Sequence, residues 1–160
     1  MGKTMKDAER RRLAKANRAA RSAPPAPRAG FAVLWCDGGS RGNPGPAAIG
    51  YLIHSPDGEE LARAAEPIGV ATAGTAEHRA LCAGLAAALG LGLARLEVRC
   101  DSRLLIERMR GEAPVHNPAL LAHQREAAEL AERIGSVAYR WVPREHNSAA
   151  DDLVSAVLDG

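Results

Sequence analysis

The sequence predicts an α/β fold in which an antiparallel start leads into a parallel portion, and three segments support this prediction. Residues 31–37 are apolar on both faces, as a central strand covered on both sides would be. Residues 75–89 are rich in Ala and Leu, which favours a helix, and Gly90 closes it. Residues 95–100 alternate polar and apolar side chains, which indicates another strand with Leu96, Val98 and Cys100 on its apolar face.

Between the first strand and the first helix, the turn residues predict two antiparallel hairpins. The first turn spans 38–46 and leads to a second strand at 47–54. Pro56-Asp57-Gly58 then predicts a hairpin turn before a third strand at 59–68.

The C-terminal half continues the alternation of helices and strands. A short helix is expected at 102–110, and a fifth strand at 137–142 precedes a closing helix at 149–158. Between them, Asn117 and Pro118 predict a helix start with an Asn cap and Pro in the first position, and Gly135 ends that helix after Ile134. The predicted order is therefore β-β-β-α-β-α-α-β-α.

The bulk composition excludes several classes of protein. The chain has 160 residues, 46% of them hydrophobic and 25% charged, which suits one globular domain. No apolar run approaches the roughly 18 residues of a membrane span, and the basic N-terminus lacks the apolar segment of a secretory signal. Three cysteines at unrelated spacings predict neither a disulfide framework nor a zinc site. A reducing cytoplasm fits best.

Charge divides the chain into two parts. Residues 1–29 carry nine Lys or Arg and two acids, whereas the remainder carries twelve Arg and seventeen acids. We therefore expect a basic, disordered extension over 1–30, ending in a Pro/Ala linker that cannot join a core, and one folded domain over 31–160. The extension either binds a polyanion or is only a solvated tail.

Acidic residues stand at positions that the hydrophobic pattern marks as buried. Glu77 shares a helix face with Leu81 and Leu85 at four-residue spacing. Asp151 likewise precedes Val154 and Leu158 on an apolar stripe. Unpaired carboxylates cost several kcal/mol each to bury, so these positions need an explanation.

Two further acids belong to the predicted strands. Asp37 has the parity of buried positions in the first strand, and Asp101 stands where the fourth strand ends. Each of the four acids also has an ordinary interpretation. Asp37 could be a turn residue, Asp101 a helix N-cap, and Glu77 and Asp151 first-turn residues that complement a helix dipole.

Taken together, the four acids predict a metal site. Strand ends and helix starts of a parallel sheet meet at one edge, where ligands usually bind. Carboxylates gathered there repel one another and raise their own pKa values, and divalent cations relieve that repulsion. Ligands that offer only oxygen indicate Mg²⁺, with Mn²⁺ as a substitute, and two ions about 4 Å apart suit displacement at phosphorus.

Four motifs in sequence resemble those of type 1 ribonuclease H enzymes, over about residues 31–158. They are Asp37-Gly-Gly-Ser-Arg-Gly-Asn-Pro-Gly-Pro46, Thr72-Ala-Gly-Thr-Ala-Glu77-His-Arg-Ala-Leu81, Val98-Arg-Cys-Asp101-Ser102 and Val142-Pro-Arg-Glu-His-Asn147-Ser-Ala-Ala150-Asp151-Asp-Leu153. The resemblance implies a ribonuclease H-like fold, a five-stranded mixed sheet of order 3-2-1-4-5 flanked by helices.

The resemblance also implies an activity and a set of roles. The chain would hydrolyse the RNA strand of RNA–DNA hybrids with two Mg²⁺ ions, leaving 5′-phosphate and 3′-hydroxyl ends. Asp37 would bridge both ions, with Asp151 on the nucleophile side and Glu77 and Asp101 on the leaving-group side. The expected contacts to nucleic acid are Gly38, Ser40, Arg41, Gly42, Asn43 and Asn147.

The sequence departs from the family pattern at two places. Ala73-Gly74 replaces an Asn pair whose amides touch the hybrid, and no basic protrusion lies between Arg110 and Asn117. We therefore predict that the N-terminal arm supplies part of the electrostatic grip. Deleting residues 1–28 should weaken hybrid binding and flatten its salt dependence.

Several further side chains receive an interpretation. His146 is an auxiliary candidate for proton or product handling, with an exposed loop residue as the alternative, and Asn147 either orients the scissile region or caps the last helix. His78 and His123 are expected to be structural. Cys36 and Cys100 should lie close together in the core as free thiols if the first and fourth strands are neighbours.

Two rival functions remain open at this point. One is a hybrid- or RNA-binding module on the same fold with weak or no cleavage, which Ala73-Gly74 mildly favours and the retention of all four acids disfavours. The other is a metal-dependent hydrolase of small phosphate esters, which the Gly42-Asn43-Pro44 loop and the basic arm disfavour. We expect a monomer, and cleavage of double-stranded RNA stays open.

Overall fold

The computed structural model describes residues 6–15 and 23–160. Its elements are β1 (Ala32–Ser40), β2 (Gly45–His54), β3 (Glu60–Ala71), α2 (Ala73–Gly90), β4 (Arg95–Cys100), α3 (Arg103–Met109), α4 (Pro118–Ile134), β5 (Ser136–Trp141), the 3₁₀ helix η1 (Arg144–Asn147) and α5 (Ser148–Asp159). We expected the N-terminal extension to lack structure, but residues 6–15 are helical and exposed. The other arm residues, 1–5 and 16–22, lie outside the described part of the chain.

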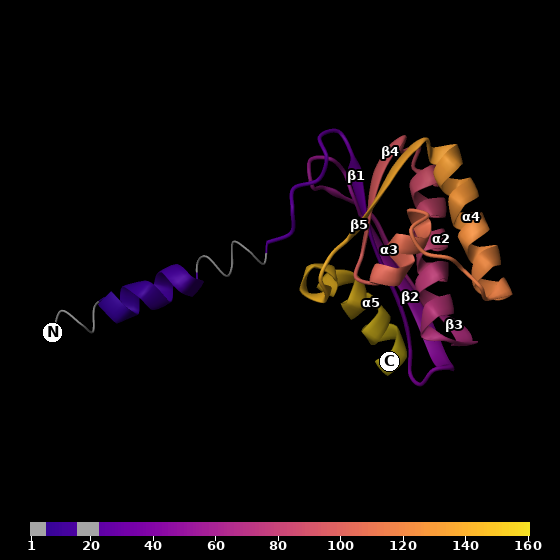
Figure 1. The fold of residues 1–160 in the computed structure, drawn as a ribbon, viewed down its shortest axis with the longest axis horizontal. Coiled ribbons are helices and arrows are strands. Elements are labelled where there is room, and N and C mark those ends of the chain that lie inside the picture. The colour runs from indigo at the N-terminus through magenta and orange to yellow at the C-terminus, as the bar shows by residue number, and fades with distance from the viewer. Residues whose placement is uncertain (1–5, 16–22) are drawn as a thin grey trace.

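The sheet has the predicted order, β3-β2-β1-β4-β5. β2 pairs antiparallel with β1 and β3, while β4 pairs parallel with β1 and β5. Helices α2 and α4 cover one face of this sheet, and α5 lies on the other side (Figure 1). The hydrophobic core fills the space under α2 and α4, with Leu34, Leu81, Leu85 and Leu96 fully buried. Both the α/β class and the strand order are therefore confirmed.

The first turn is shorter than predicted. Residues 38–40 continue β1, and Ser40 pairs with Ala47 of β2. Glycines at this point indicated a turn, but here two of them lie within a strand. The turn therefore occupies only 41–44, closed by a 2.8 Å hydrogen bond from the Arg41 amide to the Pro46 carbonyl.

Helix caps explain most of the other boundaries. Thr72 accepts a 3.1 Å hydrogen bond from the Thr75 amide, so α2 begins two residues earlier than predicted. Asn117 caps α4 as expected, with a 2.9 Å bond from the Ala119 amide, and Gly135 follows the last residue. The 3₁₀ helix η1 was not predicted, since no periodic pattern marks four residues.

β4 has the predicted bounds, but its burial differs from the expected pattern. Alternating polar and apolar residues indicated one apolar face. Glu97 and Arg99 on the other face are also buried, each about 1% exposed. They tolerate burial because the Arg99 Nε donates to Glu97 Oε2 at 2.7 Å.

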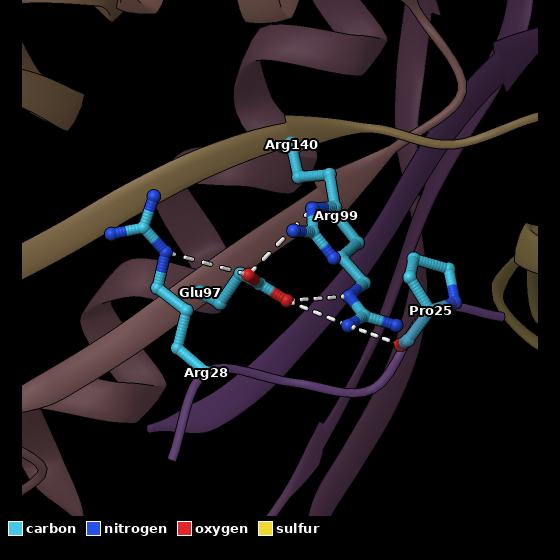
Figure 2. Close-up of polar contacts among 5 residues, drawn as sticks. All are labelled: Pro25, Arg28, Glu97, Arg99 and Arg140. Carbon is cyan, nitrogen blue, oxygen red and sulfur yellow. Dashed lines mark hydrogen bonds and ion pairs between the residues drawn. The ribbon is translucent and has the colours of Figure 1, made fainter. Parts of the chain in front are cut away.

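The Pro/Ala linker also departs from expectation. We expected it to stay clear of the core. Its residues are exposed, but the Pro25 carbonyl accepts a 2.7 Å hydrogen bond from the buried Arg99 (Figure 2). The physical reason is that a proline lacks an N–H donor but keeps a free carbonyl, and a buried guanidinium needs acceptors. The last part of the linker is thus fastened to β4.

None of the helices in the described residues has the length and apolar character needed to cross a membrane.

Candidate active site

The four acids come from four elements that meet at one edge of the sheet. Asp37 lies in β1, and Asp101 directly follows β4. These two strands are parallel neighbours with Trp35 opposite Arg99, so the two acids stand at corresponding positions two residues further on. Glu77 lies in the N-terminal half of α2 and Asp151 in the first turn of α5.

Gly38 allows α2 to approach β1 closely enough for this meeting. A Cβ atom at Gly38 would lie 2.2 Å from the Ala76 carbonyl oxygen and 2.6 Å from the Glu77 amide nitrogen. Only glycine fits between the strand and the helix at this point. The absence of a side chain at Gly38 lets the α2 backbone pack on β1, and this packing brings Glu77 beside Asp37.

The electrostatics of the site link all four acids. Burial raises the pKa of Asp37 to about 8, helped by the charges of Asp101 and Asp151, a hydrogen bond with Asp151, and the charge of Glu77. Burial also raises the pKa of Glu77, and Asp101 adds to this shift while Ser102 and Arg108 oppose it. An upward shift of this kind at Asp37 indicates a site that lacks positive charge.

Basic groups near the cluster supply little compensation. The Arg144 Nη2 lies 3.5 Å from Asp151 Oδ2, and its side chain is 77% exposed. Exposed ion pairs at such distances contribute little free energy. Arg108 acts on Glu77 from further away. The negative charge at the centre of the site is therefore largely uncompensated by the described residues.

The structure excludes the ordinary structural interpretation for three of the four acids. Asp37 is not a turn residue, because it lies inside β1. Asp101 is not the cap of α3, because Ser102 accepts the capping hydrogen bond from the Leu105 amide at 3.3 Å. Glu77 lies outside the first turn of α2. Asp151 does stand in the first turn of α5, so a contribution to that helix dipole is retained.

Asn147 holds the site together from η1. It is buried, and its Nδ2 donates to the Cys36 carbonyl at 2.9 Å and to Asp101 Oδ1 at 3.1 Å. It also occupies the N-cap position of α5, as one interpretation predicted, but its side chain makes no capping hydrogen bond there. Asn147 thus connects β1 with the acid that follows β4.

The residues expected to touch nucleic acid lie mostly in or beside the 41–44 turn. Gly42 has φ +90°, which favours glycine, and the Asn43–Pro44 peptide is cis. Asn43 Oδ1 accepts a 3.1 Å hydrogen bond from the Ala73 amide, which fastens the turn to the start of α2. Arg41 pairs with Asp159 at 2.5 Å, and the buried hydroxyl of Ser40 has no partner among the described residues.

His146 is half-buried and lies in η1, so it is not an exposed loop residue. Neither ring nitrogen has a hydrogen-bond partner within the described residues. It lines a small cavity of about 160 Å³ together with Pro24, Trp35 and His54. This places His146 beside the linker and gives it no described contact to the four acids.

The remaining predicted residues are structural. His78 is buried, and its Nδ1 lies 2.8 Å from the Gly74 carbonyl oxygen. His123 is partly buried on α4 near Glu126. Cys36 and Cys100 are free, buried thiols, and their mutual hydrogen bond with burial raises the pKa of Cys36 well above its usual range.

Sequence reasoning missed one side chain at the site. The Trp141 indole N–H donates to the Asp101 backbone carbonyl at 3.1 Å, so it also holds the segment after β4. Its position at the end of a predicted strand, next to the Val142 motif, was the available signal.

Known proteins resemble this chain in sequence over most of its length. Residues 35–157 match the model of the family described as reverse transcriptase-like. The bifunctional protein Rv2228c of Mycobacterium tuberculosis is 42% identical over 128 residues, covering 79% of this chain and 35% of that protein. Ribonuclease HI of Halobacterium salinarum is 39% identical over 132 residues, covering 82% of this chain and 66% of the relative. The chain spans about 35% of the length of the mycobacterial relatives that it matches.

Solved structures give the same picture. The N-terminal RNase H domain of Rv2228c superposes with a TM-score of 0.79 at 42% identity, covering 81% of this chain and 94% of that chain. RNase H1 of Halobacterium salinarum also has a TM-score of 0.79, at 38% identity, with 81% and 98% covered. LC11-RNase H1, of compost metagenomic origin and solved with an RNA/DNA hybrid, has a TM-score of 0.75 at 34% identity, with 80% and 96% covered. All four acids lie within the matched residues.

Proposed function

Because this chain belongs to the type 1 ribonuclease H family, we propose that it is a metal-dependent endoribonuclease that hydrolyses the RNA strand of RNA–DNA hybrids. One observation supports this proposal above the others. Four carboxylates from β1, α2, the end of β4 and α5 form one electrostatic cluster that raises the pKa of Asp37 to about 8. Such a cluster is costly unless a cation completes it.

The donor set fits Mg²⁺, with Mn²⁺ as a substitute. All the clustered groups are carboxylates, the hard oxygen ligands that these ions prefer. Within residues 6–15 and 23–160, no group of three or more His, Cys, Asp and Glu side chains is placed so that it could hold a metal ion. Mg²⁺ usually takes one or two carboxylates and completes its shell with water and substrate phosphates, so the proposed ions would need those further ligands.

Asp37 is the central member of the cluster, because its pKa responds to each of Asp101, Asp151 and Glu77. This supports Asp37 as the acid that would be shared between two ions. By the family resemblance, Asp151 would hold the ion on the nucleophile side, and Glu77 with Asp101 would hold the ion on the leaving-group side. When bound, the ions would supply activation of water and stabilisation of the leaving 3′ oxygen. The proposed products are a 5′-phosphate and a 3′-hydroxyl.

The protein itself contributes orientation. Asn147 holds one Asp101 oxygen at 3.1 Å, which leaves the other oxygen for a ligand. Gly38 lets α2 pack directly against β1, which places the Glu77 backbone beside the strand that carries Asp37. Groups fixed in this way reach their reactive geometry without reorganisation during the reaction.

We propose that the hybrid lies across the 41–44 turn. The LC11-RNase H1 neighbour was solved with an RNA/DNA hybrid, which supports hybrid binding on this fold. Gly42 has no side chain to block a nucleic acid backbone, and Arg41 lies on the exposed surface of the turn. Gly38, Ser40, Asn43 and Asn147 remain proposed contacts, with Gly38 the least accessible because it is buried under α2.

The test is cleavage of an end-labelled RNA–DNA hybrid with Mg²⁺, resolved on a denaturing gel. We expect cuts in the RNA strand only, loss of cleavage on chelation, and no cleavage by Asp37→Asn. Binding without cleavage by the wild-type protein would instead support the binding module. Hydrolysis of a small phosphate ester, with the hybrid left intact, would instead support a metal-dependent hydrolase of small phosphate esters.

Some finer points stand as proposals. Three free, buried cysteines suit a reducing compartment such as the cytoplasm. A monomer is proposed, and sedimentation with and without hybrid would test it. His146 stays an auxiliary candidate for product handling, and cleavage of double-stranded RNA would be tested on the same gel.

A further inference from the structure

We propose that Arg28 of the linker and Arg140 of β5 form a second contact site for the phosphodiester backbone of the nucleic acid substrate, in a groove beside β5. The groove has a volume of about 710 Å³, and its lining includes Arg28, Arg110, Glu112, Tyr139, Arg140 and Trp141. Glu112 is ion-paired with Arg110 at 3.1 Å, which leaves Arg28 and Arg140 as the basic groups of the groove. This second contact site would specify how the proposed substrate is held, and the inference rests on the proposed function.

The charge balance around Glu97 is the first argument. Three guanidinium groups face this one carboxylate: Arg99 at 2.7 Å, Arg140 at 3.8 Å and Arg28 at 3.9 Å. Arg99 alone satisfies one carboxylate oxygen through two short contacts. Figure 2 shows the other two arginines reaching toward the second oxygen from opposite sides. Two of the three positive charges therefore have no carboxylate of their own.

The free arginines are placed to receive an anion. Arg28 and Arg140 contact Glu97 only beyond hydrogen-bond distance, and their side chains are 62% and 38% exposed. The Arg140 Nη1 is buried and has no hydrogen-bond partner among the described residues. Guanidinium groups match phosphate oxygens through paired N–H donors, which makes a phosphodiester the best fit.

The linker explains why Arg28 is held in position. Arg99 donates to the Pro25 carbonyl at 2.7 Å, and the Arg28 guanidinium lies 5.9 Å from the centre of the Phe31 ring. These contacts fasten both sides of Arg28 to the folded body. Arg28, near the end of the linker, is thereby part of the groove.

One end of the groove borders the active site. Trp141 lines the groove, and its indole N–H donates to the Asp101 carbonyl. A strand whose scissile phosphate lies at the four acids can therefore extend across Trp141 toward Arg140. Trp141 is 38% exposed, and the Arg103 guanidinium lies 4.3 Å from the centre of its ring, which adds a further positive charge beside that path.

The experiment compares Arg28→Gln, Arg140→Gln and the double variant with Arg63→Gln. Arg63 is a matched control, because it is an exposed, ion-paired arginine on β3 at the opposite edge of the sheet. We measure hybrid affinity by fluorescence anisotropy across a salt series in chelator, together with kcat and KM in Mg²⁺. Each groove variant should raise Kd and KM severalfold, leave kcat unchanged, and reduce the salt slope of binding by about 1.

Two readouts exclude a purely structural role for the arginines. Arg140→Lys should restore much of the salt slope because it keeps the charge, whereas Arg63→Gln should match the wild type. A salt slope that is unchanged in the double variant, with only a lower Tm, would overturn the proposal. Because binding is measured without metal, a wild-type protein that binds hybrid but does not cut it would defeat the proposed activity and still test the groove.

Discussion

Two charged regions lie along β4, one within the strand and one at its C-terminal end, and they solve the problem of buried charge in opposite ways. Within β4, Glu97 is about 1% exposed and is paired at 2.7 Å with the equally buried Arg99. Where β4 ends, Asp101 faces Asp37 with no comparable cation, and the pKa of Asp37 rises to about 8. In the first region a cation of the protein balances the carboxylate, so we call it the complete region. In the second no such cation balances the acids, so we call it the incomplete region.

This difference separates stability from function. A carboxylate that is paired internally keeps its charge, and the pair can be judged by its effect on folding. A carboxylate cluster without internal cations lowers stability, so its presence indicates a ligand that supplies positive charge. Substitutions that change the charge or the packing of either region should therefore affect stability and catalysis differently.

The largest expected effect is on catalysis at the incomplete region. Asp37→Asn keeps the shape of the side chain but removes the central charge of the cluster. We expect hybrid cleavage to fall by about a thousandfold or more, because the loss of a metal ligand removes several kcal/mol of transition-state stabilisation. Unfolding in urea at pH 8 without metal should show equal or greater stability than the wild type. A variant that is both active and unstable would contradict the contrast.

The complete region should respond in the opposite sense. Arg99→Met leaves Glu97 buried without its close partner, and we expect a loss of about 3–5 kcal/mol in the free energy of unfolding. The matched control is the double variant Glu97→Leu/Arg99→Met, which removes both charges and should recover most of this loss. Urea titration measures both. A double variant as unstable as the single one would show that the pair acts through shape alone.

The close approach of β1 and α2 connects folding to the site. Gly38→Ala places a Cβ atom 2.2 Å from the Ala76 carbonyl oxygen, so α2 must shift. We expect a loss of about 1–3 kcal/mol and a fall in cleavage, because Glu77 moves away from Asp37. Gly39→Ala is the neighbouring control, since its Cβ would lie 3.6 Å from Val154, an ordinary contact. Equal stability and equal cleavage by the two variants would show that the close packing at Gly38 does not position Glu77.

The smallest effect is the gain in stability from metal, which is measured against a dependence on pH. Burial and its three acidic neighbours raise the pKa of Asp37 from 3.8 to about 8 in the folded chain, so the folded state holds a proton that the unfolded state has lost. Stability without metal should therefore fall as pH rises between about 4 and 8. Mg²⁺ at ten times its Kd should restore about 1.4 kcal/mol at pH 8. Thermal unfolding at several pH values measures this, and Asp37→Asn should lose both trends.

Sequence patterns by themselves determined the α/β class, the strand order through the family resemblance, and the four acids as a set. These features are local: periodicity shows which residues face the core, and short motifs carry the acids with their flanking glycines. The bounds of β4 and α4 followed from alternation and from the Asn117 cap for the same reason.

The tertiary structure decided which group stands opposite each polar side chain. Asn147 donates to Cys36 and Asp101, which lie 111 and 46 residues away along the chain. Arg99 is satisfied by a linker carbonyl 74 residues away, which no pattern within β4 could indicate. A sequence shows that a charge is placed on a strand, but whether that charge is neutralised depends on distant segments, and here this separates the buried pair from the acidic cluster.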